Sequence, residues 1–363
     1  MIALRIVAFI AGALLVAATI ASAVRTVILP RGVPARLTRA VFLTMRQLFR
    51  LRAGRRATYE KQDRVMALYA PLSLLVVLGV WLGLVLLGYT SMFWGLGGLS
   101  PEEAFVLSGS SLLTLGFARA EALAPTFLAV TEAGVGLVLL ALLITYLPSL
   151  YSNFSRREAA VTALEVRAGS PPSGVEMIER YWRLQRIDRL DEVWTRWETW
   201  FVEVEETHTS FPALVFFRSP QPDHSWVTAA GAVLDAASLT ASTVAIERNV
   251  QADFCIRAGY LALRRIADFF SIPYDHDPSP TDPITITRQD FDLAYDRLAA
   301  AGAPLNPDRD DAWRNYAGWR VNYDFPLVAL AEMTMAPIAP WSSDRALRDW
   351  RPPVFRIRTH RRR

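Results

Sequence analysis

The sequence predicts a mainly α-helical membrane protein with three transmembrane helices, a short re-entrant helix and a cytoplasmic α-helical domain. Of 363 residues, 52% are hydrophobic and only 20% are charged, whereas a soluble domain carries about 25% charged residues. Long uncharged runs occur only before residue 156. The remainder is ordinary polar sequence, so the pattern excludes both a wholly soluble enzyme and a polytopic transporter.

Few residues in the chain are suited to metal or redox chemistry. Cys255 is the single cysteine, which excludes an internal disulfide and a cysteine-ligated metal cluster. The histidines are scattered along the chain, at His208, His224, His276 and His360. We therefore expect no bound metal and no organic cofactor.

Residues 1–30 are predicted to form the first transmembrane helix, because Ile6–Val24 is uncharged and about long enough to cross a bilayer. A cleaved signal peptide is the alternative, since Arg5 precedes an apolar core and Ala21-Ser22-Ala23 resembles a cleavage site. The following segment is strongly basic, and basic flanks stay in the cytoplasm. This favours a retained span with its N-terminus outside.

Residues 31–65 are predicted to form an amphipathic helix at the inner membrane surface. Its apolar positions recur at helical spacing with arginines between them: Leu37, Ala40, Val41, Thr44, Leu48 and Leu51. Such a helix binds anionic lipid at the basic residues 31–64; a solvated linker helix is the alternative. Because topology accounts for the basic run, no nucleic-acid partner is expected.

Residues 66–157 contain two further predicted spans, at Met66–Thr90 and Pro125–Asn153. Glu132 is the only charge in the second of these, which ends at Arg156-Arg157. The flanks predict a multi-pass protein of the cell's inner or plasma membrane, with its N-terminus outside and its C-terminal domain in the cytoplasm.

A short helix is predicted between these two spans, at residues 102–113. Ser100 fits an N-cap, Pro101 the first helical position and Glu103 the third residue after the cap. The helix is apolar but too short to cross the bilayer, so it is predicted to be re-entrant.

The helix is followed by Thr114-Leu115-Gly116-Phe117-Ala118-Arg119, and the next span begins with Ala129-Val130-Thr131-Glu132-Ala133-Gly134-Val135-Gly136. A span, a short helix, T-L-G-F and a glycine-containing span resemble the pore module of potassium channels, particularly the bacterial two-span and two-pore-domain families. The resemblance covers residues 66–157, about a quarter of the chain.

The resemblance implies an ion path along the axis of a homotetramer. Backbone carbonyls would replace the water shell of K⁺ as the permeant ion, and glycine would supply a positive φ. The ion-binding residues carried over by the match are Thr114, Leu115, Gly116, Phe117 and Ala118. In the family this segment is the selectivity filter, and the short helix before it is the pore helix. The cytoplasmic domain would gate or assemble the pore.

The segment departs from the family pattern at three positions. Ala118 replaces a glycine, and a left-handed alanine costs roughly 1–2 kcal/mol. Arg119 replaces an aspartate at the mouth, where Glu121 could partly neutralise it. Ser110 replaces a glutamate that often supports the filter. A non-conducting membrane scaffold or sensor that retains the pore fold is therefore the alternative function.

Three residues of the last span have two interpretations each. Glu132 either supports the filter by hydrogen bonding to the pore helix or extends to water at the outer interface. Gly134 and Gly136 either form a gating hinge or allow close helix packing.

Residues 158–363 are predicted to form the cytoplasmic helical domain, with a turn-rich break inside it at residues 169–174. Aromatic residues recur at helical spacing over 175–206, and residues 228–246 are apolar enough for a fourth span or a buried bundle helix. The acid and histidine groups at 205–208 and 275–277 lack metal-site spacing. No catalytic motif is present, so the protein is not predicted to be an enzyme. Residues 356–363 form a basic tail.

Overall fold

The computed structural model describes residues 2–29, 36–53, 59–247, 250–345 and 347. This part of the chain is mainly helical, as predicted, and contains no strand beyond the isolated bridge Val244–Leu305. It divides into two compact units, residues 1–57 with 65–152 and residues 58–64 with 153–363. Among the described helices, three are long and apolar enough to cross a membrane, at Ile2–Val27, Tyr59–Leu96 and Leu123–Ala168.

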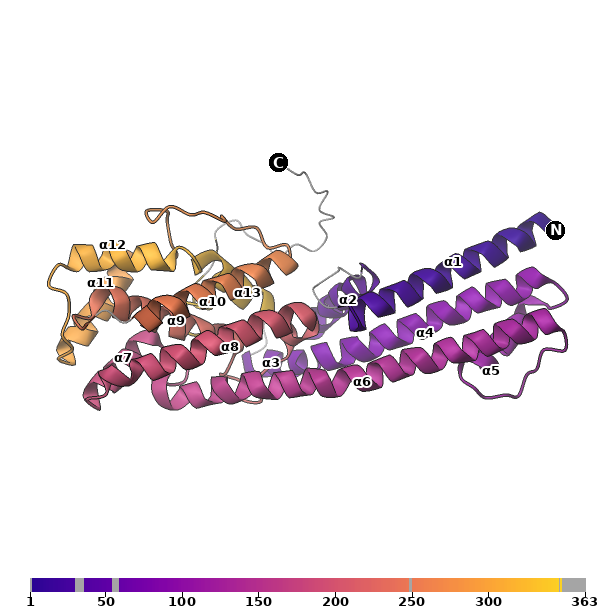
Figure 1. The fold of residues 1–363 in the computed structure, drawn as a ribbon, viewed down its shortest axis with the longest axis horizontal. Coiled ribbons are helices and arrows are strands. Elements are labelled where there is room, and N and C mark those ends of the chain that lie inside the picture. The colour runs from indigo at the N-terminus through magenta and orange to yellow at the C-terminus, as the bar shows by residue number, and fades with distance from the viewer. Residues whose placement is uncertain (1, 30–35, 54–58, 248–249, 346, 348–363) are drawn as a thin grey trace. The chain divides into compact units, whose positions relative to one another are not determined.

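The first unit is built on close packing between α1 (Ile2–Val27) and α4 (Tyr69–Leu96), which lie side by side (Figure 1). A Cβ added at Gly12 would lie 2.4 Å from the carbonyl oxygen of Gly88, and one at Gly95 would lie 2.7 Å from that of Arg5. Small residues let the two backbones approach, which is how apolar helices gain contact area without a hydrophobic driving force.

Helix α2 (Arg36–Ala53) follows α1 and packs on α4. The Tyr69 hydroxyl donates to the carbonyl of Phe42 at 2.9 Å, and the Tyr69 ring also meets Phe49 edge-on. Leu48 and Leu51 stay exposed. The helix within 31–65 is thus confirmed for residues 36–53, and 30–35 and 54–58 lie outside the described residues.

Helix α5 (Pro101–Leu112) is the short helix that the sequence predicts, within one residue at each end. Ser100 accepts from the Glu103 N–H, and the Glu103 carboxylate accepts from the Ser100 N–H, which completes the capping box. Its buried side chains Ala104, Leu107 and Leu112 join the core around Trp81 and Phe93 of α4.

Helix α6 (Leu123–Ala168) is longer than the predicted span and contributes to both units. The sequence predicts a domain boundary at residue 157, and the two compact units divide within α6 between Ser152 and Asn153, although the helix itself continues without interruption. Residues 154–168 contain neither glycine nor proline, so nothing in the chain ends the helix before Gly169. Gly169 has a φ of 81°, and its N–H caps the carbonyl of Glu165 at 2.8 Å.

The second unit surrounds α9 (Trp226–Thr243), in which almost every side chain is buried. The helix packs against α7 (Gly174–Arg183), α10 (Val250–Phe269), α12 (Arg309–Arg320) and α13 (Asp324–Thr334). Helix α8 (Leu190–Ser210) packs on α10, and α11 (Arg288–Ala300) on α7. The apolar segment 228–246 is therefore the central helix of a bundle.

One predicted helical stretch is divided in the structure. The aromatic stretch 175–206 breaks after α7, where Gln185 has a φ of 55°, and resumes at η1 (Ile187–Arg189) and α8. Apolar periodicity continues across this break because the flanking helices face one core. The basic tail 356–363 lies outside the described residues.

Candidate functional site

Glu132 connects three helices of the first unit. Its side chain is fully buried, and its Oε1 lies 2.5 Å from the hydroxyl of Ser108 on α5. The same hydroxyl lies 3.1 Å from the carbonyl oxygen of Leu86 on α4. The hydrogen bond from this acid to the short helix is thus present, and the carboxyl group does not extend to water.

Ser110 holds the segment that follows α5. Its carbonyl oxygen accepts the N–H groups of Leu115 at 2.8 Å and Gly116 at 3.4 Å. Its hydroxyl accepts the N–H of Ala118 at 3.0 Å. Residues 114–118 therefore fold back beside the last turn of α5.

The carbonyl oxygens of residues 114–117 accept no hydrogen bond from the described part of the chain. The N–H groups of Leu115 and Gly116 donate to the carbonyl oxygen of Ser110, whereas the carbonyl oxygens of residues 114–117 have no donor among the described residues. Carbonyl groups of this kind need water or a cation as a partner. This is the arrangement that a row of carbonyl ion ligands requires.

Backbone strain in this segment lies at a different residue from the one the sequence indicates. Gly116 has a φ of 74° and Thr114 a φ of 55°, whereas Ala118 is outside the positive-φ region. The expected left-handed alanine is therefore absent. A β-branched threonine in the left-handed region is unusual, and such conformations gather at functional sites.

The outer part of the segment is exposed in the single chain. Leu115 is 60% exposed and Phe117 is 67% exposed. Arg119 and Glu121 are exposed as well, and no ion pair joins them among the described residues. The suggested neutralisation of Arg119 by Glu121 is thus not seen within one chain.

The two glycines of α6 differ in their surroundings. A Cβ added at Gly136 would lie 2.4 Å from the carbonyl oxygen of Leu112, the last residue of α5. Gly134 has no neighbour within 4 Å of such an atom. Gly136 therefore lets α6 approach the end of α5. Packing does not require a glycine at position 134, so of the two glycines Gly134 is the one left as a candidate hinge.

Arg157 anchors the end of α6 that lies in the second unit. A guanidinium carries five N–H groups. Those of Arg157 reach Glu158 through Nε at 2.8 Å and Nη2 at 2.7 Å, and the carbonyls of Leu214 at 2.8 Å and Phe217 at 2.7 Å. The fifth faces Nε2 of His208 at 3.1 Å. Each of the three guanidinium nitrogens of this buried cation therefore has a hydrogen-bond partner.

His208 is thereby assigned a tautomer. Because Arg157 can only donate, Nε2 of His208 must accept, and the ring proton resides on Nδ1 beside the hydroxyl of Thr207 at 3.2 Å. Burial, followed by the charge of Arg157, lowers the pKa of His208 well below its usual value. This histidine therefore belongs to the Arg157 network.

Arg218 forms a second anchor in the same part of the unit. It donates to Asp63 and to the hydroxyl of Tyr59 at 3.3 Å, both on α3 (Tyr59–Ala67), the helix that precedes α4. It also donates to the carbonyls of Thr334 and Met335, each at 2.9 Å. The segment 212–218 therefore holds both α3 and the end of α6.

These anchors were missed from the sequence. Arg157 was read only as a charge that sets topology, because its acceptors lie 57 and 60 residues away. No sequence signal pairs Arg218 with Asp63, which are 155 residues apart.

A buried ion cluster lies in the core of the second unit. Arg320 is fully buried and donates to Asp235 at 2.5 Å and to Asp324 at 2.7 Å. Burial alone lowers the pKa of Arg320, but the two carboxylates raise it well above its usual value. The cluster fixes α9, α12 and α13 to one another.

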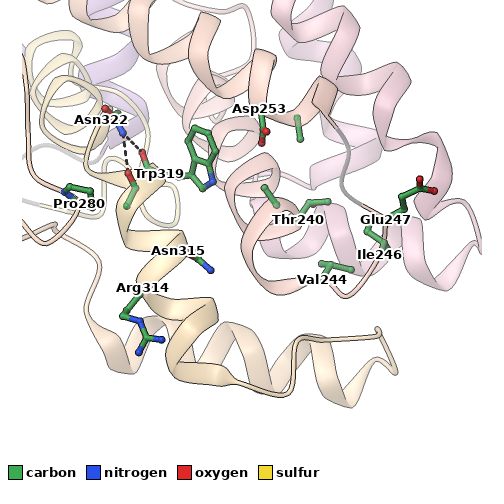
Figure 2. A pocket seen from close by; sticks show the side chains of 13 residues that line it. Thr240, Val244, Ile246, Glu247, Asp253, Pro280, Arg314, Asn315, Trp319 and Asn322 are labelled. Atoms are coloured by element: carbon green, nitrogen blue, oxygen red, sulfur yellow. Dashed lines mark hydrogen bonds between the residues drawn. The ribbon is translucent and has the colours of Figure 1, made fainter.

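A cavity of about 590 Å³ lies between α12 and the facing ends of α9 and α10; Figure 2 shows the side chains that line it. The Trp319 indole and Asn315 extend from α12 toward Thr240 and Val244. Its charged lining residues are of both signs, Arg314, Glu247 and Asp253. This mixture does not select one class of ligand.

No group of histidine, cysteine and carboxylate side chains suited to a metal ion occurs within the described residues. The pair Asp275 and Asp277 is exposed, and the Asp275 carboxylate accepts the Asp277 N–H at 3.0 Å. This is a local turn.

The chain was compared with known protein families, curated proteins and solved structures. No protein-family model matches the chain, and no curated protein or solved structure matches it either.

Proposed function

We propose that this chain is a potassium-type cation channel or a close structural relative of one, with ions passing along the axis of a homotetramer. The observation that carries the proposal is the row of carbonyl oxygens at residues 114–117, which has no hydrogen-bond donor among the described residues. This row follows a capped short helix and lies between two candidate membrane spans. The C-terminal end of α5 also bears negative dipole charge, which favours a cation nearby.

The exposed apolar side chains of the segment support an assembly of several chains. Leu113, Leu115 and Phe117 are each more than half exposed, and they lie between the helices that could span a membrane. Clusters of exposed large apolar residues mark contact surfaces. A neighbouring copy would cover them while leaving the carbonyls on the axis.

In this proposal the helices cross the cell membrane with the second unit in the cytoplasm. Helix α2 lies at the inner surface, where its arginines contact anionic lipid. The anchors at Arg157 and Arg218 hold the parts of α6 and α3 that belong to the second unit, which supports a role of that unit in gating or assembling the pore.

Potassium flux from proteoliposomes tests conduction directly. The natural protein should release trapped K⁺, and Gly116→Asp should abolish release, because it places a side chain and a charge at a positive-φ position of the carbonyl row. Gly98→Asp is the matched control. Gly98 also has a positive φ, 86°, and is exposed with no neighbour within 4 Å of an added Cβ.

Flux that persists in Gly116→Asp, or is lost equally in Gly98→Asp, would contradict the proposed ion path. Native mass spectrometry from nanodiscs should give a tetramer, and a monomer or dimer would exclude a four-chain pore.

A non-conducting scaffold or sensor is the second candidate function. It is favoured by Arg119, which is exposed beside the carbonyl row and has no ion pair with the described residues, and by Ala118, which does not continue the positive-φ pattern. The double variant Ala118→Gly/Arg119→Asp separates the two functions. If only this variant conducts, the natural protein is the non-conducting form.

A further inference from the structure

A small cavity in the second unit is lined by α6, α7 and α8. Its volume is about 250 Å³, and α6 contributes one face of successive turns, Ala160, Ala163, Leu164 and Arg167. Helix α8 contributes Glu192, Val193, Arg196 and Trp197, and α7 contributes Tyr181. Pockets for drug-sized ligands span about 300–1,000 Å³, so this cavity suits a smaller molecule.

The two arginines of the cavity retain unused donors. Arg167 donates through Nε to the Tyr181 hydroxyl at 3.2 Å and through Nη1 to the carbonyl of Ala163 at 2.9 Å. Its Nη2 has no acceptor among the described residues. Arg196 makes no ion pair or hydrogen bond with any described residue.

Most arginines in the described part of the second unit pair with a carboxylate, whereas Arg167 and Arg196 do not. Arg180, Arg183 and Arg189 on neighbouring turns each have one. Glu192 is the single acid that lines the cavity, and it is paired with Arg189. The lining therefore presents two positive charges with open N–H groups and one negative charge that is already engaged.

We propose that this cavity binds a phosphate group, either as inorganic phosphate or on a small soluble phosphate ester. Guanidinium groups bind phosphate oxygens through paired N–H donors, and the Tyr181 hydroxyl can donate its own hydrogen as a further contact. The apolar wall formed by Leu164, Val193 and Trp197 leaves room for a small organic group beside the phosphate.

The site lies on the same helix as Glu132 and the end anchored by Arg157. A bound phosphate joins α6 to α8 through Arg167 and Arg196, and so stiffens the last turns of α6. Binding does not require ion conduction, so it is measured independently of flux.

Isothermal titration of the full-length protein in phosphatidylcholine nanodiscs tests the site, with sodium phosphate as the probe and sodium chloride at equal ionic strength as the reference. We expect saturable phosphate binding at or below about 1 mM. Arg196→Gln should weaken binding at least about tenfold, because a charge-assisted contact is lost. Arg196 is exposed on a helix, and glutamine is a good helix former, so the fold is retained.

Two further variants give the charge control. Glu192→Gln should tighten binding, since it removes the negative charge of the lining. Arg183→Gln, at a 70% exposed arginine outside the cavity, should leave affinity within about twofold.

The proposal is overturned if phosphate does not bind at 10 mM (about tenfold above the expected range). It is also overturned if Arg183→Gln weakens binding as much as Arg196→Gln. A repeat in nanodiscs containing phosphatidic acid separates the sources of phosphate. Unchanged titration supports a soluble ligand, and loss of titration assigns the site to a lipid headgroup and refutes the soluble ligand.

Discussion

Replacing Arg157 with methionine should strongly destabilise the second unit. The side chains of Arg157 and Glu158 are only 2% and 8% exposed, and Oε2 of Glu158 already lacks a partner. Methionine retains the apolar volume but leaves the Glu158 carboxylate buried without a cation. It also leaves the carbonyl of Phe217 without its donor.

The magnitude follows from the buried charge. Breaking one side of a buried ion pair costs about 3–5 kcal/mol, which exceeds the roughly 1–3 kcal/mol of a single unsatisfied carbonyl. For a unit of about 200 residues, each kcal/mol lowers the Tm by about 2–4 °C. We therefore expect a fall in Tm of roughly 6–20 °C.

Thermal unfolding of the full-length protein, followed by tryptophan fluorescence, measures this change. Arg156→Met is the matched control, since the neighbouring arginine is exposed and bonds only to Asn153 at 3.2 Å. Its Tm should stay within about 2 °C of the natural protein. The double variant Arg157→Met/Glu158→Gln should recover part of the loss, because the orphaned charge is removed.

A fall below about 2 °C in Arg157→Met would refute the buried-charge argument, because it would mean that Glu158 finds water or another cation. A double variant no more stable than the single one would show that packing, rather than charge, determines the effect.

Two further predictions concern pH and helix packing. The folded state lowers the pKa of His208. The neutral ring therefore contributes fully to the free energy of unfolding above about pH 6.5, the ordinary pKa of histidine. As the pH falls below that value, this contribution is lost at up to about 1.4 kcal/mol per pH unit. His208→Gln keeps an acceptor for Arg157 but cannot titrate. Between pH 7 and pH 5, a range that brackets the ordinary histidine pKa, its Tm should therefore fall less than that of the natural protein. An equal fall in both proteins would exclude His208 as the titrating group. Gly136→Ala should lower Tm and tetramer yield, because its Cβ would lie 2.4 Å from the Leu112 carbonyl, whereas Gly134→Ala meets open space. Equal behaviour of both variants would contradict a packing role for Gly136, and altered K⁺ flux in Gly134→Ala alone would favour a hinge there.

Several helices could be predicted from the sequence because they depend on local chemistry. The capped helix after Ser100 was predicted to within a residue, because the Ser100–Glu103 reciprocal bonds depend on residues three apart. The long apolar helices follow from uncharged length alone. The apolar residues 228–246 were predicted to form either a fourth span or a buried bundle helix. The burial of nearly all side chains of α9 supports the bundle helix.

The candidate site was predictable in its residues but not in its contacts. Thr114–Ala118 were named from their order in the chain, yet the role of Ser110 as the anchor of that segment required its backbone geometry. Strain was expected at Ala118 and lies at Thr114 instead, since φ depends on how the segment folds back on α5.

The sequence by itself determined which segments are apolar helices, where they begin, and which short segment resembles an ion path, because those properties depend on neighbours within a few turns. Only the tertiary structure decided that Glu132 meets Ser108, that Arg157 and Arg218 anchor segment 212–218, and that Arg196 lines a cavity unpaired. Those contacts join residues 24 to 155 positions apart. Buried polar groups are satisfied by whichever partners packing brings near, and the order of residues along the chain does not specify that choice.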